Sequence, residues 1–169
     1  MKQMKGPDTL TGPEEPLQST SRLGDWYANV NPLPFRGRRV VVFLNQKTLL
    51  AVFVPGGGGS SELLTVFVER TGQLLRRLDI PEPKVQQELT AMEEIRLAPT
   101  QNKSTLGSLN DTGKAIGLYT GHKYPSFNHI NWDREELIFT DRINWPLNPK
   151  PIKQIVYPKD LVRELFEER

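Results

Sequence analysis

Two runs of β-branched and aromatic residues lie on either side of a short polar segment in the first third of the chain. The runs read RRVVVFL (38–44) and LLAVFV (49–54), and NQKT (45–48) separates them. Such runs favour strands, and a polar segment of four residues between them predicts a β-hairpin at about 40–54. Because both runs are apolar on both faces, we expect the hairpin to form the centre of a covered sheet.

A strongly amphipathic segment follows the hairpin. The segment PGGGGSS (55–61) fits either a natural loop or an engineered linker, and it lacks the Gly-Lys-Ser/Thr ending of a Walker phosphate loop. We expect Ser60 or Ser61 to cap a helix over 62–78 that packs across the hairpin. Its apolar residues recur at helical spacing on one face: Leu63, Leu64, Phe67, Leu74, Leu75 and Leu78.

The remaining patterns complete an α+β fold, a small and mainly antiparallel sheet covered by two or three helices. We expect residues 1–22 to form a flexible leader and residues 23–169 a single globular domain. DREELIF (133–139) fits either a helical turn or a strand. The other predicted elements are a strand at DWYANV (25–30), a helix at PEPKVQQELTAMEEI (81–95), a strand at IRLAP (95–99), a helix at DTGKAIGLYTG (111–121), and a helix at PKDLVRELFEER (158–169) with Leu161, Leu165 and Phe166 inward.

Composition excludes several classes of site. The 169 residues contain no cysteine, so disulfides, thiolate zinc sites and cysteine nucleophiles are all excluded. A net charge of +2 gives no electrostatic case for nucleic acid, so we expect Arg70, Arg76 and Arg77 to form a solvated helix face, with contact to nucleic acid as the minor alternative. No run reaches the length of a membrane span, and the first residues lack the apolar core of a signal peptide. We therefore expect a cytoplasmic protein.

The stretch NKSTLGSLNDTG (102–113) concentrates polar residues ahead of the predicted helix at 111–121. We interpret it first as a helix start, with Ser108 or Asn110 as the N-cap, Asp111 in the first turn and Gly107 in a turn of positive φ. The same geometry would serve an anion, since free N–H groups at a helix start attract negative charge. The candidate ligand-binding residues are Lys103, Ser104, Gly107, Ser108, Asn110 and Asp111.

Several segments resemble, in order, a family of short bacterial and archaeal proteins described as a domain of unknown function. The most specific is the S-x-x-G-S-x-N-D string at 104–111, and the resemblance spans about Leu23 to Phe166. The chain departs from the family at its start, where MKQMKGPDTLTG replaces a basic strand with paired lysines, and after Asp111, where relatives have large apolar residues. The resemblance implies no particular chemistry. The matching segments are DWYANV (25–30), FLNQKTLLAVFV (43–54), RLAPTQNKSTLGSLND (96–111), PLNPKPIKQIVYP (146–158) and LVRELF (161–166).

No complete catalytic signature is present. A nucleophilic Ser104 or Ser108 would need His122 or His129 as its base, and the serines match neither a Gly-x-Ser-x-Gly elbow nor a Ser-x-x-Lys pair. The two histidines and Asp133 are spaced more loosely than most metal ligands. We therefore expect no metal and no cofactor, and we assign no catalytic residue.

The lack of cysteine, the presence of only two histidines and the lack of a complete catalytic signature favour a non-enzymatic binding or regulatory module. We expect it to act through contacts with a protein partner or through self-association. The alternative is an anion- or nucleotide-binding protein, or a hydrolase, centred on residues 103–111.

Overall fold

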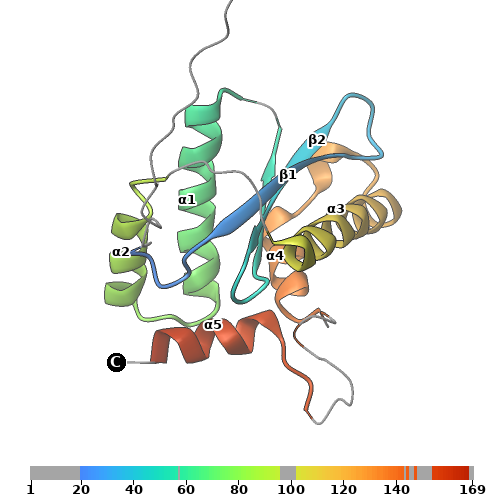
Figure 1. Cartoon of the computed structure of the whole chain (residues 1–169). Helices are drawn as coiled ribbons and strands as arrows, with labels where there is room; N and C mark the ends of the chain where they lie inside the picture. The colour runs from blue at the N-terminus through green and yellow to red at the C-terminus, as the bar shows by residue number, and fades with distance from the viewer. Residues whose placement is uncertain are drawn as a thin grey trace, which may run out of the picture.

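A three-stranded antiparallel sheet forms the centre of the protein (Figure 1). The computed structural model describes residues 20–56, 58–95, 102–142, 144, 147 and 154–167. The strands β1 (Trp26–Pro32), β2 (Arg39–Asn45) and β3 (Ala51–Pro55) lie in the order β1-β2-β3. This arrangement confirms the α+β class and the predicted hairpin of β2 and β3. Only β2 is central, because β1 pairs with its other side and leaves β3 at an edge of the sheet.

The hairpin turn is built around the side chain of Asn45. Its Oδ1 accepts hydrogen bonds from the backbone N–H groups of Lys47 and Thr48, at 3.1 and 3.0 Å, and from the Thr48 hydroxyl at 2.9 Å. Its Nδ2 donates to the Leu23 carbonyl at 2.9 Å. One buried amide therefore closes the turn and attaches it to the segment that leads into β1. Such local side-chain bonds are the reason asparagine is favoured in turns.

Helices α1 (Ser60–Arg77), α2 (Glu82–Ala91) and α5 (Pro158–Glu167) cover one face of the sheet. The predicted α1 face is confirmed, and Phe67 stacks on Phe43 of β2 with ring centroids 4.0 Å apart. The predicted serine cap is wrong, because the N-cap residue is Gly59 and no side chain caps the helix. The buried apolar residues of this face are Leu23, Val41, Phe43, Leu50, Val52, Val54, Phe67, Leu74, Leu75, Leu78, Ile80, Val85, Met92, Val162 and Phe166.

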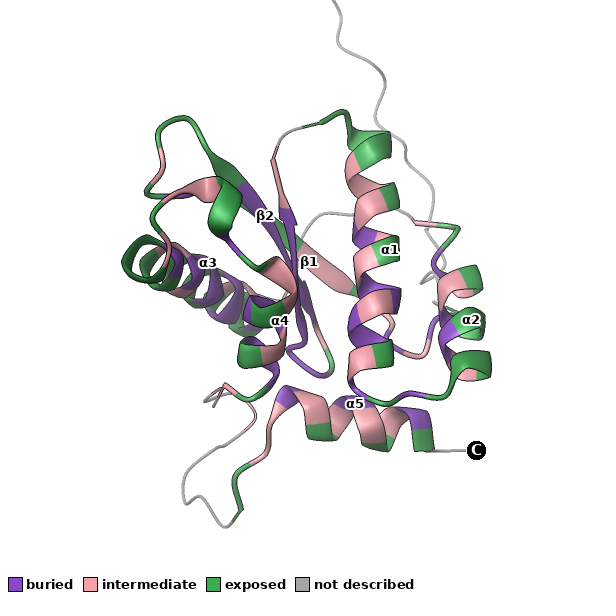
Figure 2. Cartoon of the chain, turned by 180° about the vertical axis from the view of Figure 1, so that it is seen from behind, coloured by how far each residue is buried: buried purple, intermediate pink, exposed green. Residues whose placement is uncertain are grey.

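Helices α3 (Lys103–Lys123) and α4 (Trp132–Thr140) cover the opposite face, and the short 3-10 helix η1 (Phe127–His129) joins them. Figure 2 shows the buried sides of the helices turned toward the sheet. DREELIF is thus helical. The buried apolar residues of this face are Leu33, Val40, Val42, Leu44, Leu49, Ala51, Phe53, Leu109, Ile116, Ile130 and Phe139.

Glycines let α3 lie close to β1 and the loop after it. A Cβ at Gly113 would collide with the Asn31 side chain, and one at Gly121 would lie 2.6 Å from Cγ of Pro34. At Gly117 a Cβ would have an ordinary contact, 3.7 Å from a backbone oxygen of β1. The absence of side chains at Gly113 and Gly121 therefore sets the separation of α3 from β1 and the loop after it.

A buried carboxylate holds the segment before β1 against α2. Glu88 accepts hydrogen bonds from the Ser21 hydroxyl, from the Arg22 N–H at 2.8 Å and from the Leu23 N–H at 3.2 Å. Ser21 is only 8 % exposed. Residues 1–19 of the predicted leader, and 96–99 of the predicted IRLAP strand, lie outside the described residues. In the described part of the chain, no helix combines the length and apolarity needed to cross a membrane.

Candidate functional site

The polar stretch at 102–113 is the first half of a long helix. Asn102 is the N-cap of α3, and its side-chain oxygen accepts from the N–H groups of Ser104 and Thr105 at 3.0 and 3.1 Å. The predictions that Ser108 or Asn110 caps a helix and that Asp111 lies in its first turn are therefore wrong. Burial of Leu109 and other inward residues allows the helix to begin about two turns earlier than the pattern suggested.

The six candidate ligand-binding residues point in different directions from α3. Ser104, Gly107 and Asp111 recur at intervals of three and four, so they share the outer face, where all three are exposed. Gly107 is helical and does not form the predicted turn. Lys103 and Asn110 are exposed beside that face, and Asn110 Oδ1 accepts from Asn29 Nδ2 at 3.1 Å. Ser108 is buried.

An anion at this helix start would find few free donors. Asn102 already occupies the Ser104 and Thr105 N–H groups, and its carbonyl oxygen accepts from the Leu106 N–H at 3.1 Å. Among the first four helical N–H groups, that of Lys103 alone has no such bond within the described chain. The anion site stays a prediction, with one backbone donor rather than several to support it.

The histidines lie away from these serines. His122 follows Ser108 by 14 residues on the same helix, which corresponds to about 21 Å along its axis. His129 Nδ1 instead contacts the Ser126 hydroxyl at 2.7 Å in the exposed η1 segment. Asp133 contacts two arginines, and no group of three potential metal ligands occurs among the described residues.

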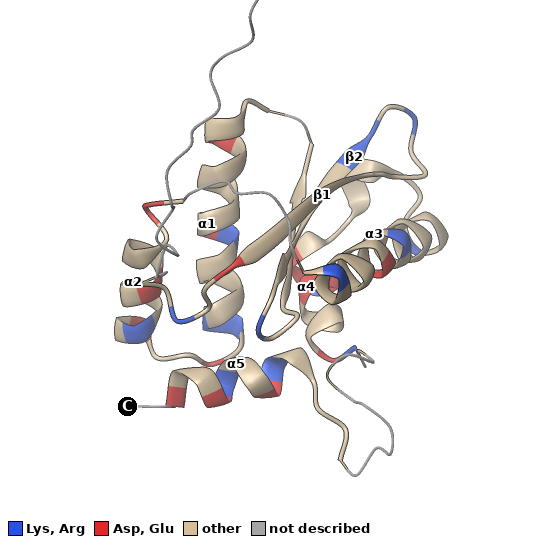
Figure 3. Cartoon of the chain, in the orientation of Figure 1, with Lys and Arg blue, Asp and Glu red and all other residues tan. Residues whose placement is uncertain are grey.

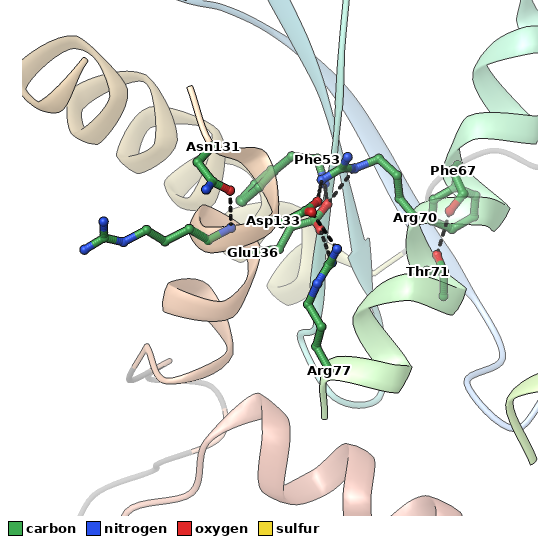
Figure 4. Close-up of polar contacts among 9 residues, drawn as sticks. Phe53, Phe67, Arg70, Thr71, Arg77, Asn131, Asp133 and Glu136 are labelled. Carbon is green, nitrogen blue, oxygen red and sulfur yellow. Dashed lines mark hydrogen bonds and ion pairs between the residues drawn. The ribbon is translucent and has the colours of Figure 1, made fainter. Parts of the chain in front are cut away.

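A charged cluster joins α1 to α4 (Figure 4). Arg70 donates to Glu136 at 3.0 Å and to Asp133 at 3.1 Å, and Arg77 contacts Asp133 at 2.6 Å. The side chain of Arg70 is only 15 % exposed, so the prediction of a solvated arginine face is wrong there. It holds for Arg76, which pairs at the surface with Glu82.

Glu136 is fully buried and reaches the outer edge of the sheet. Its Oε1 accepts the Phe53 N–H at 2.9 Å, which occupies a backbone donor on the edge strand β3. Burial raises the pKa of Glu136 from about 4.5 to about 6, although Arg70 and the Phe53 N–H act in the opposite direction. Perturbed carboxyls occur at functional sites. This one is enclosed by α1, α4 and β3, so we assign it to the connection between the layers.

The adjacent Glu135 joins α4 to the end of α3. It is fully buried, and its Oε1 contacts Nζ of Lys123 at 2.5 Å and accepts the Tyr124 hydroxyl at 2.7 Å. The pKa of Lys123 is raised, chiefly because the amine donates a hydrogen bond to Glu135. The two neighbouring glutamates therefore fix α4 against both α1 and α3.

A mainly apolar hollow lies between helices α3 and α4. Its volume is about 350 Å³, and five residues line it: Tyr119, Ile138, Phe139, Asp141 and Arg142. We call it the α3–α4 hollow. Tyr119 and Ile138 are 54 % and 40 % exposed, whereas Phe139 is buried and meets the Tyr119 ring edge-on at 6.0 Å. Exposed aromatic and aliphatic side chains around a hollow are typical of protein-binding surfaces.

Sequence reasoning did not select any residue of this hollow. The available signal was Ile138, a bulky residue on the side of α4 away from its buried residues. Tyr119 lies on α3 at the helical angle of the buried Ser108 and Thr112, so the pattern of α3 did not indicate that Tyr119 is exposed. The predicted helix at 111–121 already contained Tyr119, but nothing in the sequence indicated that residues 138–142 would lie beside it.

The fold and the site define a small α+β domain, with helices on both faces of a three-stranded sheet and an apolar hollow between two of them. The chain belongs to the family described as a domain of unknown function (DUF6933), whose model matches residues 1–161. The resemblance to a family of unknown function is thereby confirmed, and its bacterial and archaeal range and its 104–111 motif stay predictions. The comparisons with curated proteins and with solved structures found no match.

Proposed function

We propose that the protein is a binding module that acts through protein contacts, with the α3–α4 hollow as its docking surface. The observation that carries this proposal is the exposure of Tyr119 and Ile138 in a hollow that the buried Phe139 also lines. Burying such side chains on association removes apolar surface from water, at about 25 cal/mol per Å². Aromatic anchors in a pocket are the usual centres of binding energy.

The charges beside the hollow specify the partner further. Asp141 forms an ion pair with Lys159, so its charge is already balanced. The Arg142 guanidinium lies over the Phe139 ring, 5.4 Å from its centroid, and makes no ion pair with another described residue. The partner segment that fits is therefore one that places an apolar side chain beside a carboxylate.

The test compares two matched substitutions, Ile138→Asp and Ile155→Asp. The two isoleucines are 40 % and 43 % exposed, and Ile155 lies outside the hollow. Proteins captured by the wild type and by Ile155→Asp, but lost with Ile138→Asp, would be purified and titrated directly. We expect Arg142→Gln to weaken their binding and added salt to do the same, because screening reduces the attraction between exposed charges.

Equal capture by both variants would contradict the proposal. A thermal-shift screen with nucleotides, inorganic phosphate and divalent cations addresses the alternative centred on 103–111. A ligand at 100 times its dissociation constant stabilises by about 2.7 kcal/mol. A shift of that size that Lys103→Ala abolishes would support the anion-binding alternative in place of the protein-binding one.

A further inference from the structure

The outer face of α3 carries a regular stripe that the proposed docking surface does not use. Its residues recur at intervals of 3, 4, 3, 4 and 3, which is the spacing of the contact positions when two helices pack along their length. All six are exposed, and α3 packs on β1 and β2 through its opposite face, although Gly121 lies at the margin of the exposed face, where Pro34 approaches it. We call these residues the α3 stripe: Ser104, Gly107, Asp111, Lys114, Leu118 and Gly121.

Contacts among the described residues do not explain two features of the stripe, the exposure of Leu118 and the glycine at position 107. Leu118 is 65 % exposed, the highest value among the large apolar residues of the described chain that are exposed. Among the described residues, no atom lies within 4 Å of where the Gly107 Cβ would be, so none of them requires a glycine there. A glycine in a helix costs about 1 kcal/mol relative to alanine. A small residue that is costly in the isolated chain fits a position where a neighbour approaches closely.

The stripe also carries one negative and one positive side chain that a second molecule can contact. Asp111 and Lys114 lie at its centre, and neither forms an ion pair with another residue that the structure describes. Figure 3 shows that α3 carries charges of both signs. Each of these two side chains can therefore form an ion pair with an opposite charge on a second molecule.

We propose that the α3 stripe binds the same stripe of a second copy of this chain, with the two helices antiparallel about a two-fold axis near their midpoints. In this register Asp111 lies opposite the partner's Lys114, and Lys114 opposite the partner's Asp111. Gly107 provides space for the partner's Leu118, and Ser104 lies opposite the partner's Gly121. The stripe is thus complementary to itself in both charge and size.

The parallel arrangement lacks this complementarity. It would place each stripe residue opposite its own copy, so that two aspartates would meet, two lysines would meet, and Gly107 would face glycine. Like charges in direct contact are unfavourable, and opposed glycines leave a gap. The pattern of charge and size therefore selects both the second copy as the occupant and the antiparallel direction.

The expected dimer is weak and depends on concentration. A helix of 21 residues is about 30 Å long, and one pair of such helices buries less than the roughly 800 Å² per partner of a standard interface. We expect sedimentation of the full chain to show a monomer–dimer equilibrium that shifts with protein concentration and weakens with salt.

The decisive test uses charge reversal. Asp111→Lys and Lys114→Asp should each raise the dimer dissociation constant by about tenfold or more, since about 1.4 kcal/mol corresponds to a factor of ten. The two variants mixed together should form a heterodimer, because each supplies the charge that the other needs. The double variant Asp111→Lys/Lys114→Asp should dimerise as the wild type does.

Circular dichroism and melting temperature verify that each variant is folded, and the exposure of both positions makes this the expected result. A wild-type chain that stays monomeric at every concentration would overturn the proposal. So would a dimer that neither single reversal weakens, or two weakened variants that fail to associate when mixed. Gly107→Leu provides an independent check, because it should weaken the dimer while leaving the monomer folded.

Discussion

Replacing Glu136 by glutamine tests the energetics of the connection between α1, α4 and β3. Glu136 is fully buried, and burial raises its pKa from about 4.5 to about 6. Each unit by which a pKa differs between the folded and unfolded states corresponds to 1.36 kcal/mol, so this difference corresponds to about 2 kcal/mol.

The sign follows from which state binds the proton more tightly. The folded protein holds the Glu136 proton more strongly than the unfolded chain does, because the charged carboxylate is deprived of water. The resulting stabilisation is complete below about pH 4.5 and is lost as the pH rises through about 6. Glutamine has no such equilibrium, so the Glu136→Gln variant should lack this part of the pH dependence.

The assay is urea unfolding of the wild type, of Glu136→Gln and of the surface control Glu164→Gln at several pH values. The unfolding free energy of the wild type minus that of Glu136→Gln should fall by about 2 kcal/mol between about pH 4.5 and pH 7. The unfolding free energy of the wild type minus that of Glu164→Gln should show no comparable fall. Parallel pH profiles for the wild type and Glu136→Gln would show that burial does not perturb this carboxyl in the way we infer.

Three further predictions concern the helices. Gly107→Ala should raise the free energy of unfolding by up to about 1 kcal/mol. Gly113→Ala should lower it, because the new Cβ would collide with the Asn31 side chain. Thermal melts of the two variants check both signs. Asn102→Ala should cost about 1 kcal/mol in urea unfolding, as loss of an N-cap does. Phe67→Asp should cost several kcal/mol and unfold the domain, and an unchanged melting temperature would show that the buried face of α1 is misassigned.

Elements whose burial follows a short repeat could be predicted from the sequence. The hairpin was visible because continuous apolar runs of strand length flank a turn that Asn45 organises locally. The α1 face was visible because Phe67, Leu74 and Leu75 recur at helical spacing. In each case the signal and its physical cause lie within about twenty residues of one another.

The start of α3 could not be predicted in the same way. Its first turns contain glycine, serine and asparagine, which favour turns and caps when judged locally. Packing of Leu109 and Ile116 against the sheet overrides those preferences. Apolar and polar residues are not clearly separated around α3, so the sequence did not indicate which residues form its outer face. The residues of the two proposed surfaces were therefore not recognised as neighbours.

Long-range charge pairing was likewise beyond local pattern analysis. Arg70 lies 63 residues before Asp133 and 66 before Glu136 in the sequence, and nothing near Arg70 indicates that it will be largely buried. Consecutive glutamates at 135 and 136 suggest a solvent-facing segment. Both are fully buried because their partners arrive from different helices.

The attachment of residues 21–23 to Glu88 has a practical consequence for anyone who wishes to shorten the chain. Glu88 is only 2 % exposed, and the hydroxyl and two N–H groups that satisfy its carboxylate all come from those three residues. A version that began at Gly24 would retain the helices and strands of the described residues yet leave a carboxylate without those donors in the interior, at a cost of several kcal/mol. A shortened version should therefore keep residues 21–23, which the bounds of the described helices and strands alone would not indicate.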